Sequence, residues 1–261
     1  MVTFRLNGET VSMPVDQNLM EYLRDELRLT SLKNGCAEGV CGACMILVEG
    51  KATRACTLKA EKLEGKSVLT LEGLSQREKD IYAWAFGEAG AVQCGFCTPG
   101  MVISAKGLLD HNPNPLPIEV KKALRNNICR CTGYIKIEKA VLLAAKALRG
   151  EISLGEKAGA RVGIDLERVD ARVKTLGQAE YVDDLMVEGM LYGAVLRTKY
   201  LRAVINKVDT SKAENHPGVE VVLLAEDIPG QRIEGYLVKD WPTLVAVGEE
   251  TRYVGDALVL V

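Results

Sequence analysis

Apolar and polar residues alternate over the first fifteen positions of the chain, which is the pattern of strands with one buried face. Asn7 and Gly8 interrupt the alternation, and this pair favours the positive φ values of a type I′ turn. A β-hairpin is therefore predicted over residues 2–15. Leucines then recur at helical spacing and predict an amphipathic helix over residues 17–28, with Asp16 as its N-cap.

Short apolar runs resume the strand pattern after a loop at residues 33–44 that is punctuated by glycines. They predict strands at 45–48, 53–58 and 67–71, with a turn between the first two. A hairpin, a helix and several short mixed strands together predict a small β-grasp-like domain over residues 1–74.

From residue 75 the apolar positions follow the helical period instead. Thr98 and Pro99 supply an N-cap and an N1 proline for the second helix, and the proline-rich residues 111–117 end it. A four-helix domain is therefore predicted over residues 75–150. Its helices are expected at 76–87, 99–110, 118–127 and 134–149.

The third part of the chain follows a stretch of glycines and charges at residues 151–164, which has no apolar period and is predicted to be a linker. Residues 165–261 predict an α+β segment. The apolar run Ala257–Val261 has no terminating signal, so we expect either that its strand partners lie on another polypeptide or that the sequence is a fragment. Strands are expected near 190–198, 202–209, 219–224 and 243–247, with a short helix near 211–215.

Composition is that of a globular protein, because 48% of the 261 residues are hydrophobic and the length suits two or three small domains. The formal net charge of -2 provides no basic field for nucleic acid or for an anionic membrane. The chain begins without a charged and then apolar leader, and no run of about eighteen apolar residues occurs. We expect a cytoplasmic protein that contacts small molecules and other proteins.

The eight cysteines fall into two groups of four with different spacings. In a reducing cytosol such cysteines are more often ligands than disulfides. The first group reads CxxxxCxxC and has its fourth cysteine after eleven intervening residues, the plant-type ferredoxin arrangement for a 2Fe-2S cluster. The second reads CxxC, then thirty-one residues, then CxC. Two one-electron carriers are therefore predicted. The first group is Cys36, Cys41, Cys44 and Cys56, and the second is Cys94, Cys97, Cys129 and Cys131.

The neighbours of the cysteines support this chemistry and leave alternatives open. Gly35, Gly39 and Gly42 interleave the first group, where a tight loop can aim backbone N–H groups at sulfur, although glycines also make ordinary turns. Zinc bound by four cysteines is the main alternative, more for the second group than for the first, but structural zinc sites usually pair two CxxC knuckles. Gln93 precedes Cys94 and is either an amide that recognises a polar ring or a helix cap.

Other common sites are disfavoured. The two histidines, His111 and His216, lie in proline-containing loops and are expected at the surface, which disfavours Rieske and mononuclear His-iron sites. The motifs GxGxxG after a strand, GxxxxGK and GxSxG do not occur, so flavin and nicotinamide sites cannot be placed. Asp183 and Asp184 are expected to form a solvated turn.

Several motifs make the chain similar to the xanthine oxidase family of molybdenum hydroxylases. The resemblance implies two iron-sulfur domains over residues 1 to about 149, a ferredoxin-like β-grasp domain and a four-helix domain. From about residue 168 it implies the α/β hammerhead that opens the molybdenum-binding region of the family. The motifs are GCAEGVCGAC at 35–44, QCGFCTPG at 93–100, ICRCTGY at 128–134, GQAEYVDD at 177–184 and AEDIPG at 225–230.

The resemblance implies oxidative hydroxylation of a purine, an aldehyde or an N-heterocycle, with water as the oxygen source. A molybdopterin centre would accept two electrons, and two 2Fe-2S clusters would pass them on singly. In the family the cluster held by CxC lies nearest the pterin, and residues that match Gln93 and Cys131 contact it. The other cluster lies toward the acceptor. The family's catalytic glutamate and glycine-rich pterin loops are missing, so no catalytic residue is expected here and the molybdenum cofactor is expected mainly on a partner chain or a continuation.

No flavin domain separates the iron-sulfur region from the molybdenum-binding region, so the layout departs from that of xanthine oxidase. It is closer to the layout of bacterial aldehyde oxidoreductases and some xanthine dehydrogenases. A separate flavin subunit or a soluble acceptor is therefore expected as a partner. After Leu196 and Arg197 the family's frequent Ser-Pro and following His are also replaced, by residues 198–202. A stand-alone two-cluster electron carrier or redox sensor, with residues 165–261 as a protein-binding module, is the alternative.

Overall fold

The computed structural model describes residues 1–155, 162–163 and 166–261. It forms two compact units, Met1–Leu185 and Met186–Val261. Half of the linker expected at 151–164, namely residues 156–161 and 164, and the expected start of the third region at 165 lie outside the described residues. Residues 166–185 pack with the first unit, so the second unit begins about twenty residues later than that expected start. Among the described residues, no helix is both long and apolar enough to cross a bilayer.

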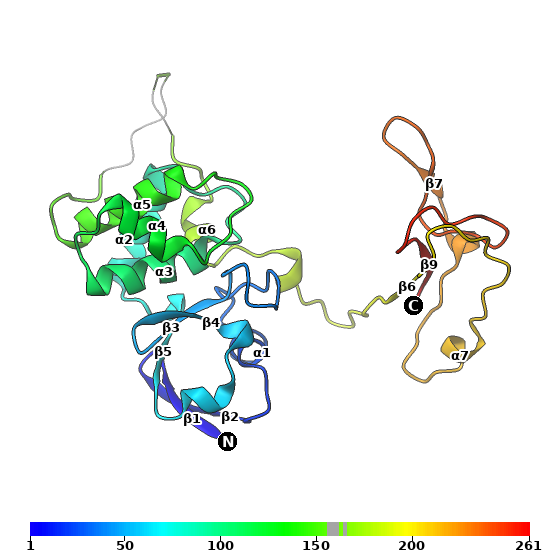
Figure 1. Ribbon diagram of the computed structural model, residues 1–261, viewed down its shortest axis with the longest axis horizontal. Helices are drawn as coiled ribbons and strands as arrows, with labels where there is room; N and C mark the ends of the chain where they lie inside the picture. Colours follow the sequence, from blue (N-terminus) through cyan, green and yellow to red (C-terminus); the bar gives the residue numbers. More distant parts are fainter. Residues whose placement is uncertain (156–161, 164–165) are drawn as a thin grey trace. The chain divides into compact units, whose positions relative to one another are not determined.

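A five-stranded mixed sheet forms the first part of unit 1, in the order β2-β1-β5-β3-β4 (Figure 1). The expected hairpin is confirmed, since β1 and β2 pair antiparallel around Asn7 and Gly8, whose φ values are 52° and 96°. β5 pairs parallel with β1 and antiparallel with β3. The strands are β1 (Val2–Leu6), β2 (Glu9–Met13), β3 (Met45–Val48), β4 (Lys51–Arg54) and β5 (Ser67–Leu69).

The helix expected over residues 17–28 is shorter and less regular. It consists of α1 (Leu19–Glu21) followed by the π-helical turn η1 (Tyr22–Glu26). Its N-cap is Asn18 and not Asp16, because Oδ1 of Asn18 accepts the backbone N–H groups of the first turn. Asp16 lies two residues too early to reach those donors.

The strand expected at 53–58 also ends early, at Arg54. There the chain turns into the 3-10 helix η2 (Ala55–Thr57), and the N–H of Ala55 donates to the carbonyl oxygen of Cys44 at 3.1 Å. This turn buries Cys56 beside β3. The other 3-10 turns are η3 (Ala60–Leu63), η4 (Leu71–Gly73), η5 (Val182–Asp184) and η6 (Ala225–Asp227).

Four helices follow close to their expected positions. α2 packs against α5, and α3 packs against α4 and β3. The N-cap position of α3 is Cys97, whose side chain makes no capping hydrogen bond, and not Thr98, which is already helical. α4 ends three residues earlier than expected. The helices are α2 (Gln76–Glu88), α3 (Thr98–His111), α4 (Pro117–Leu124) and α5 (Ile135–Leu148).

The sheet and the helices share β3, which explains why they form one unit. Because successive side chains of a strand point to opposite faces, Met45 and Leu47 enter the core among the helices while Ile46 enters the core under the sheet. The five-residue helix α6 (Ala171–Thr175) then returns to pack on α2 and α3.

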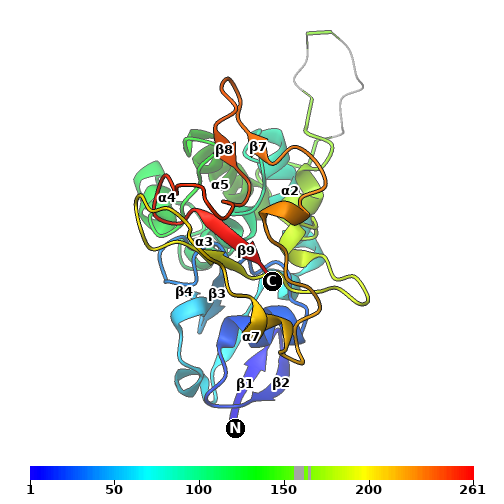
Figure 2. The same ribbon diagram turned by 90° about the vertical axis from the view of Figure 1, so that its right-hand side faces the viewer.

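Unit 2 has little regular structure (Figure 2). β6 (Val195–Arg197) pairs antiparallel with β9 (Ala257–Leu260), and β7 (Ile233–Glu234) with β8 (Trp241–Pro242). The expected short helix is present as α7 (Ser211–Glu214).

Three of the strands expected in this unit are not regular strands. Residues 202–209 and 219–224 contribute only the isolated bridges Val204–Glu250 and Leu223–Leu260, and 243–247 forms no named strand. The expectation that the last strand pairs with another polypeptide is wrong, because β9 pairs with β6 of the same chain. Apolar alternation marked these segments, but a strand also needs a neighbour in register along its length.

Candidate metal centres

The loop that follows Lys33 folds around the first thiol. Sγ of Cys36 accepts three backbone N–H groups, each at 3.4 Å, from Cys41, Glu38 and Val40. These donors lower the pKa of Cys36 to about 6, because they stabilise the thiolate. The loop is therefore shaped to hold an anionic sulfur.

The glycines of this loop make the turns and leave the hydrogen bonding to their neighbours. Gly39 and Gly42 have φ values of 73° and 71°, which other residues rarely adopt. Gly35 is required for another reason, since a Cβ there would lie 2.9 Å from Sγ of Cys41. The expected tight loop is present, but the N–H groups that reach the Cys36 sulfur belong to residues between the glycines.

The eight cysteines are all free. Among the described residues, no three His, Cys, Asp or Glu side chains gather closely enough to hold a single metal ion. The thiols of each group nevertheless lie near enough to influence one another's pKa. They do so mainly in pairs, which are Cys36 with Cys41, Cys44 with Cys56, Cys97 with Cys129, and Cys94 with Cys131.

In the second group the fold closes the gap between CxxC and CxC. Cys97 caps the N-terminus of α3, and Cys129 lies between α4 and α5. Sγ of Cys129 accepts the hydroxyl of Thr132 at 3.1 Å and the N–H of Cys131 at 3.4 Å. Burial alone would raise the pKa of the Cys129 thiol, but these hydrogen bonds stabilise the thiolate, and the pKa lies below its ordinary value.

The second pair of this group lies at the surface. Cys94 and Cys131 are exposed, and so is the neighbouring Gln93, whose carbonyl oxygen accepts Nζ of Lys174 at 3.2 Å. In the first group, by contrast, Cys44 and Cys56 are buried, and burial raises the pKa of Cys44 to about 12. The structure thus gathers every cysteine that the spacing singled out and brings Gln93 beside the exposed pair.

The two cysteine groups are joined directly. The N–H of Ile128, next to Cys129, donates to the carbonyl oxygen of Cys41 at 2.8 Å. Beside it the buried Asn127 donates from Nδ2 to the carbonyl oxygen of Gly42 at 3.0 Å. No sequence pattern indicated this contact, because it joins loops that are distant in the chain.

The expected solvated turn at Asp183 and Asp184 is wrong for Asp184. Its carboxylate accepts Nζ of Lys33 at 3.0 Å and pairs with Arg24, and only 4% of the side chain is exposed. Burial alone would raise the pKa of Asp184, but these partners and the N–H of Tyr181 stabilise the carboxylate and hold the pKa below its usual range. Sequence reasoning missed Arg24, Lys33 and Tyr181 because a lone charged or aromatic residue gives no sign of its distant partner.

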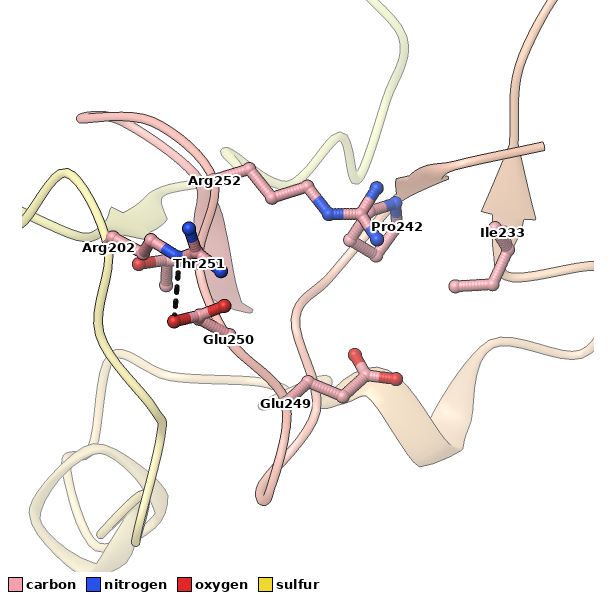
Figure 3. A pocket seen from close by; sticks show the side chains of 7 residues that line it. All are labelled: Arg202, Ile233, Pro242, Glu249, Glu250, Thr251 and Arg252. Atoms are coloured by element: carbon pink, nitrogen blue, oxygen red, sulfur yellow. Dashed lines mark ion pairs between the residues drawn. The ribbon is translucent and has the colours of Figure 1, made fainter. Parts of the chain in front are cut away.

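Unit 2 carries a cavity of about 530 Å³ that contains none of the expected site residues (Figure 3). Arg202 and Glu250 form an ion pair of 2.8 Å on its wall, and Glu249, also on the wall, pairs with Arg232. The cavity is lined mainly by charged and polar groups and holds no cysteine.

Three family models match the chain. Residues 4–71 match the 2Fe-2S iron-sulfur cluster binding domain, and residues 70–142 match the [2Fe-2S] binding domain. Residues 176–261 match the a/b hammerhead domain of aldehyde oxidase and xanthine dehydrogenase.

Known proteins agree with these matches. The aldehyde oxidoreductase of Megalodesulfovibrio gigas is 35% identical over 98% of this chain, which spans 31% of that protein. The nicotinate dehydrogenase small FeS subunit of Eubacterium barkeri is 45% identical over 56% of this chain and 94% of that subunit. The solved aldehyde oxidoreductase from Desulfovibrio gigas superposes with a TM-score of 0.87 at 33% identity, over all of this chain and 31% of that one.

The paired thiols fit the group that these domains bind, because a 2Fe-2S cluster takes two cysteine sulfurs at each iron. The chain is therefore an iron-sulfur protein with two 2Fe-2S cluster-binding domains and a hammerhead domain. It belongs to the xanthine oxidase family of molybdenum hydroxylases.

Proposed function

We propose that this chain is the electron-transfer part of a molybdenum hydroxylase. The observation that carries the proposal is that eight free cysteines lie on two sets of ligand loops, which the hydrogen bond between Ile128 and Cys41 joins. When bound, the two 2Fe-2S clusters would supply one-electron centres, and a molybdopterin cofactor would supply oxidation of a purine, aldehyde or N-heterocycle with water as the oxygen source.

Each cysteine group holds one cluster in this proposal. The N–H groups directed at Cys36 and the hydroxyl directed at Cys129 favour the more negative, reduced state, because they place positive dipole ends against sulfur. The first cluster takes Cys36, Cys41, Cys44 and Cys56, and the second takes Cys94, Cys97, Cys129 and Cys131.

The exposed end of the second group faces the pterin. Cys131 and the Gln93 amide lie at the surface, where a ring held by another polypeptide or a continuation of the chain can reach them. The first group then lies toward the acceptor, which is a separate flavin subunit or a soluble protein. This chain supplies no catalytic residue in the proposal; it orients the pterin edge and conducts electrons away from it.

The finer architecture supports the same assignment. The mixed five-stranded sheet with α1 is a β-grasp domain over residues 1–74, and α2 to α5 form a four-helix domain over residues 75–150. The hammerhead segment joins the molybdenum-binding part, so the assembly is a hetero-oligomer or a longer chain. Eight free cysteines fit a cytoplasmic location.

Analysis of the native assembly tests this function against that of a stand-alone carrier. We expect molybdenum, pterin and about four irons for each copy of the chain. An assembly that contains the irons and no molybdenum would exclude the proposal.

Substitution of Gln93 tests the pterin contact. Gln93→Ala should slow reduction of the clusters by substrate and leave reduction by dithionite unchanged. Gln231→Ala, which changes an exposed glutamine of unit 2, is the matched control. Equal substrate reduction in both variants would contradict a role for Gln93.

A further inference from the structure

A short segment outside both cluster-binding domains packs against the loops that carry their cysteines. Residues 177–184, here named the Tyr181 segment, follow the second of the two cluster-domain matches, which ends at residue 142. Gly177 lies close to the loop before Cys36, because a Cβ there would be 2.6 Å from Cα of Ser31. The same Cβ would be 3.4 Å from Pro99 at the start of α3. The segment is therefore fitted between the loop before Cys36 and the start of α3.

The ring of Tyr181 touches residues of both loops. Its hydroxyl donates to the carbonyl oxygen of Cys94 at 2.7 Å, and its ring meets Phe96 edge to face at 5.2 Å. From the loop before Cys36, Nζ of Lys33 lies 4.8 Å from the centroid of the Tyr181 ring. Phe96 in turn lies 3.5 Å from where a Cβ on Gly35 would be. One side chain thus connects the neighbourhoods of Cys36 and Cys94.

Buried charges hold this ring in place. Asp184 accepts Nζ of Lys33 and the N–H of Tyr181, both at 3.0 Å, and pairs with Arg24. The side chains of Lys33, Asp184 and Arg24 are 1%, 4% and 8% exposed. Buried charges are tolerated when they are paired in good geometry, so displacing the segment would separate the buried Lys33 from its carboxylate partner Asp184.

We propose that Tyr181 is a positioning residue for the second cluster, held by the Lys33–Asp184–Arg24 group. By donating to the carbonyl of Cys94 it orders that ligand loop and favours the reduced state of the cluster that Cys94 binds. The physical reason is that an O–H dipole directed at a ligand residue offsets added negative charge, and hydrogen bonding is one of the factors that set cluster potentials. The inference rests on the proposed assignment of Cys94 as a cluster ligand.

Tyr181→Phe tests the proposal in the full chain loaded with iron and sulfide, because it keeps the ring and removes only the O–H. We expect full iron content and a downward shift in the midpoint potential of the second cluster, with the first unchanged. Tyr236→Phe, at a fully exposed tyrosine of unit 2, should shift neither potential. The EPR signal of the second cluster is identified as the one that Cys131→Ser alters.

Two further measurements separate positioning from general stability. In Tyr181→Phe, amide hydrogen exchange over residues 93–98 should rise. Asp184→Asn should lower the same potential, and the double variant should match Tyr181→Phe, because Asp184 acts through the ring.

Three outcomes would overturn the inference. They are an unchanged second potential in Tyr181→Phe, equal shifts of both potentials, and equal iron loss from both clusters. If Cys131→Ser alters neither signal, the ligand assignment itself fails, and that result is distinct from a failure of Tyr181.

Discussion

The N–H of Ile128 donates to the carbonyl oxygen of Cys41 at 2.8 Å, so a single hydrogen bond joins the backbones beside the two cysteine groups. The contact depends on a close approach of main chains. Gly42 lies where a Cβ would come within 2.2 Å of the carbonyl oxygen of Asn126. The two cluster-binding domains are therefore built against each other at their ligand loops.

Gly42→Ala should separate these loops. The added Cβ meets a backbone oxygen that cannot move aside, and φ at this position is 71°. Gly65→Ala is the matched control, since φ there is 67° and nothing lies within 4 Å, so only the strain of about 1–2 kcal/mol applies. Thermal unfolding and iron content should show a larger loss for Gly42→Ala. Equal losses would mean that the close approach has no role.

Asn127→Ala should destabilise the same junction by about 1–3 kcal/mol, because it leaves buried polar groups unpaired. Oδ1 of Asn127 accepts the hydroxyl of Ser104 at 2.7 Å, and Nδ2 donates to Gly42. Adding Ser104→Ala should recover part of the loss. Asn114→Ala, at an exposed loop position, should change stability by less than about 0.5 kcal/mol. Denaturant unfolding followed by circular dichroism measures these differences, and a neutral Asn127→Ala would refute the account.

Removal of iron followed by unfolding should open every cysteine to alkylation, including Cys44 and Cys56, which are buried in the fold. In the loaded chain the thiolates are bound to metal, so mass spectrometry should find no modified cysteine, whereas the iron-free chain in denaturant should gain eight modifications. Cys56→Ser should lose about two of about four irons and leave the second group protected. Modification spread over both groups in that variant would contradict two independent clusters.

The Arg232 guanidinium and the N–H of Ala246 lower the pKa of Glu249. A carboxyl group with a depressed native pKa stabilises the fold above its ordinary pKa of about 4.3, and this contribution is lost as pH falls through the lower native value. The pair is partly exposed, so the contribution is below about 1 kcal/mol. Arg232→Gln should raise the midpoint of the Glu249 carboxyl resonance in an NMR titration. Arg202→Gln should instead raise the titration midpoint of Glu250, which is the partner of Arg202, and leave the midpoint of Glu249 unchanged.

Local chemistry explains what could be predicted. The Asn7-Gly8 turn, the four helices and the paired spacing of the cysteines depend on residues close together in the chain, so their patterns are readable before folding. The strands of unit 2 were harder to predict, because alternation marks a possible strand while pairing depends on a distant partner. β9 found such a partner in β6, which its apolar run did not reveal.

The sequence by itself determined the chemistry of this protein: eight thiols, their grouping, and the family to which their motifs point. Tertiary structure alone decided which thiols pair, that Ile128 meets Cys41, and that Asp184 is buried against Lys33 and Arg24. The physical reason is range. Spacing encodes ligands and turns that lie within a few residues, whereas a buried ion pair or a contact between loops exists only after packing has brought distant segments together and removed water from between them.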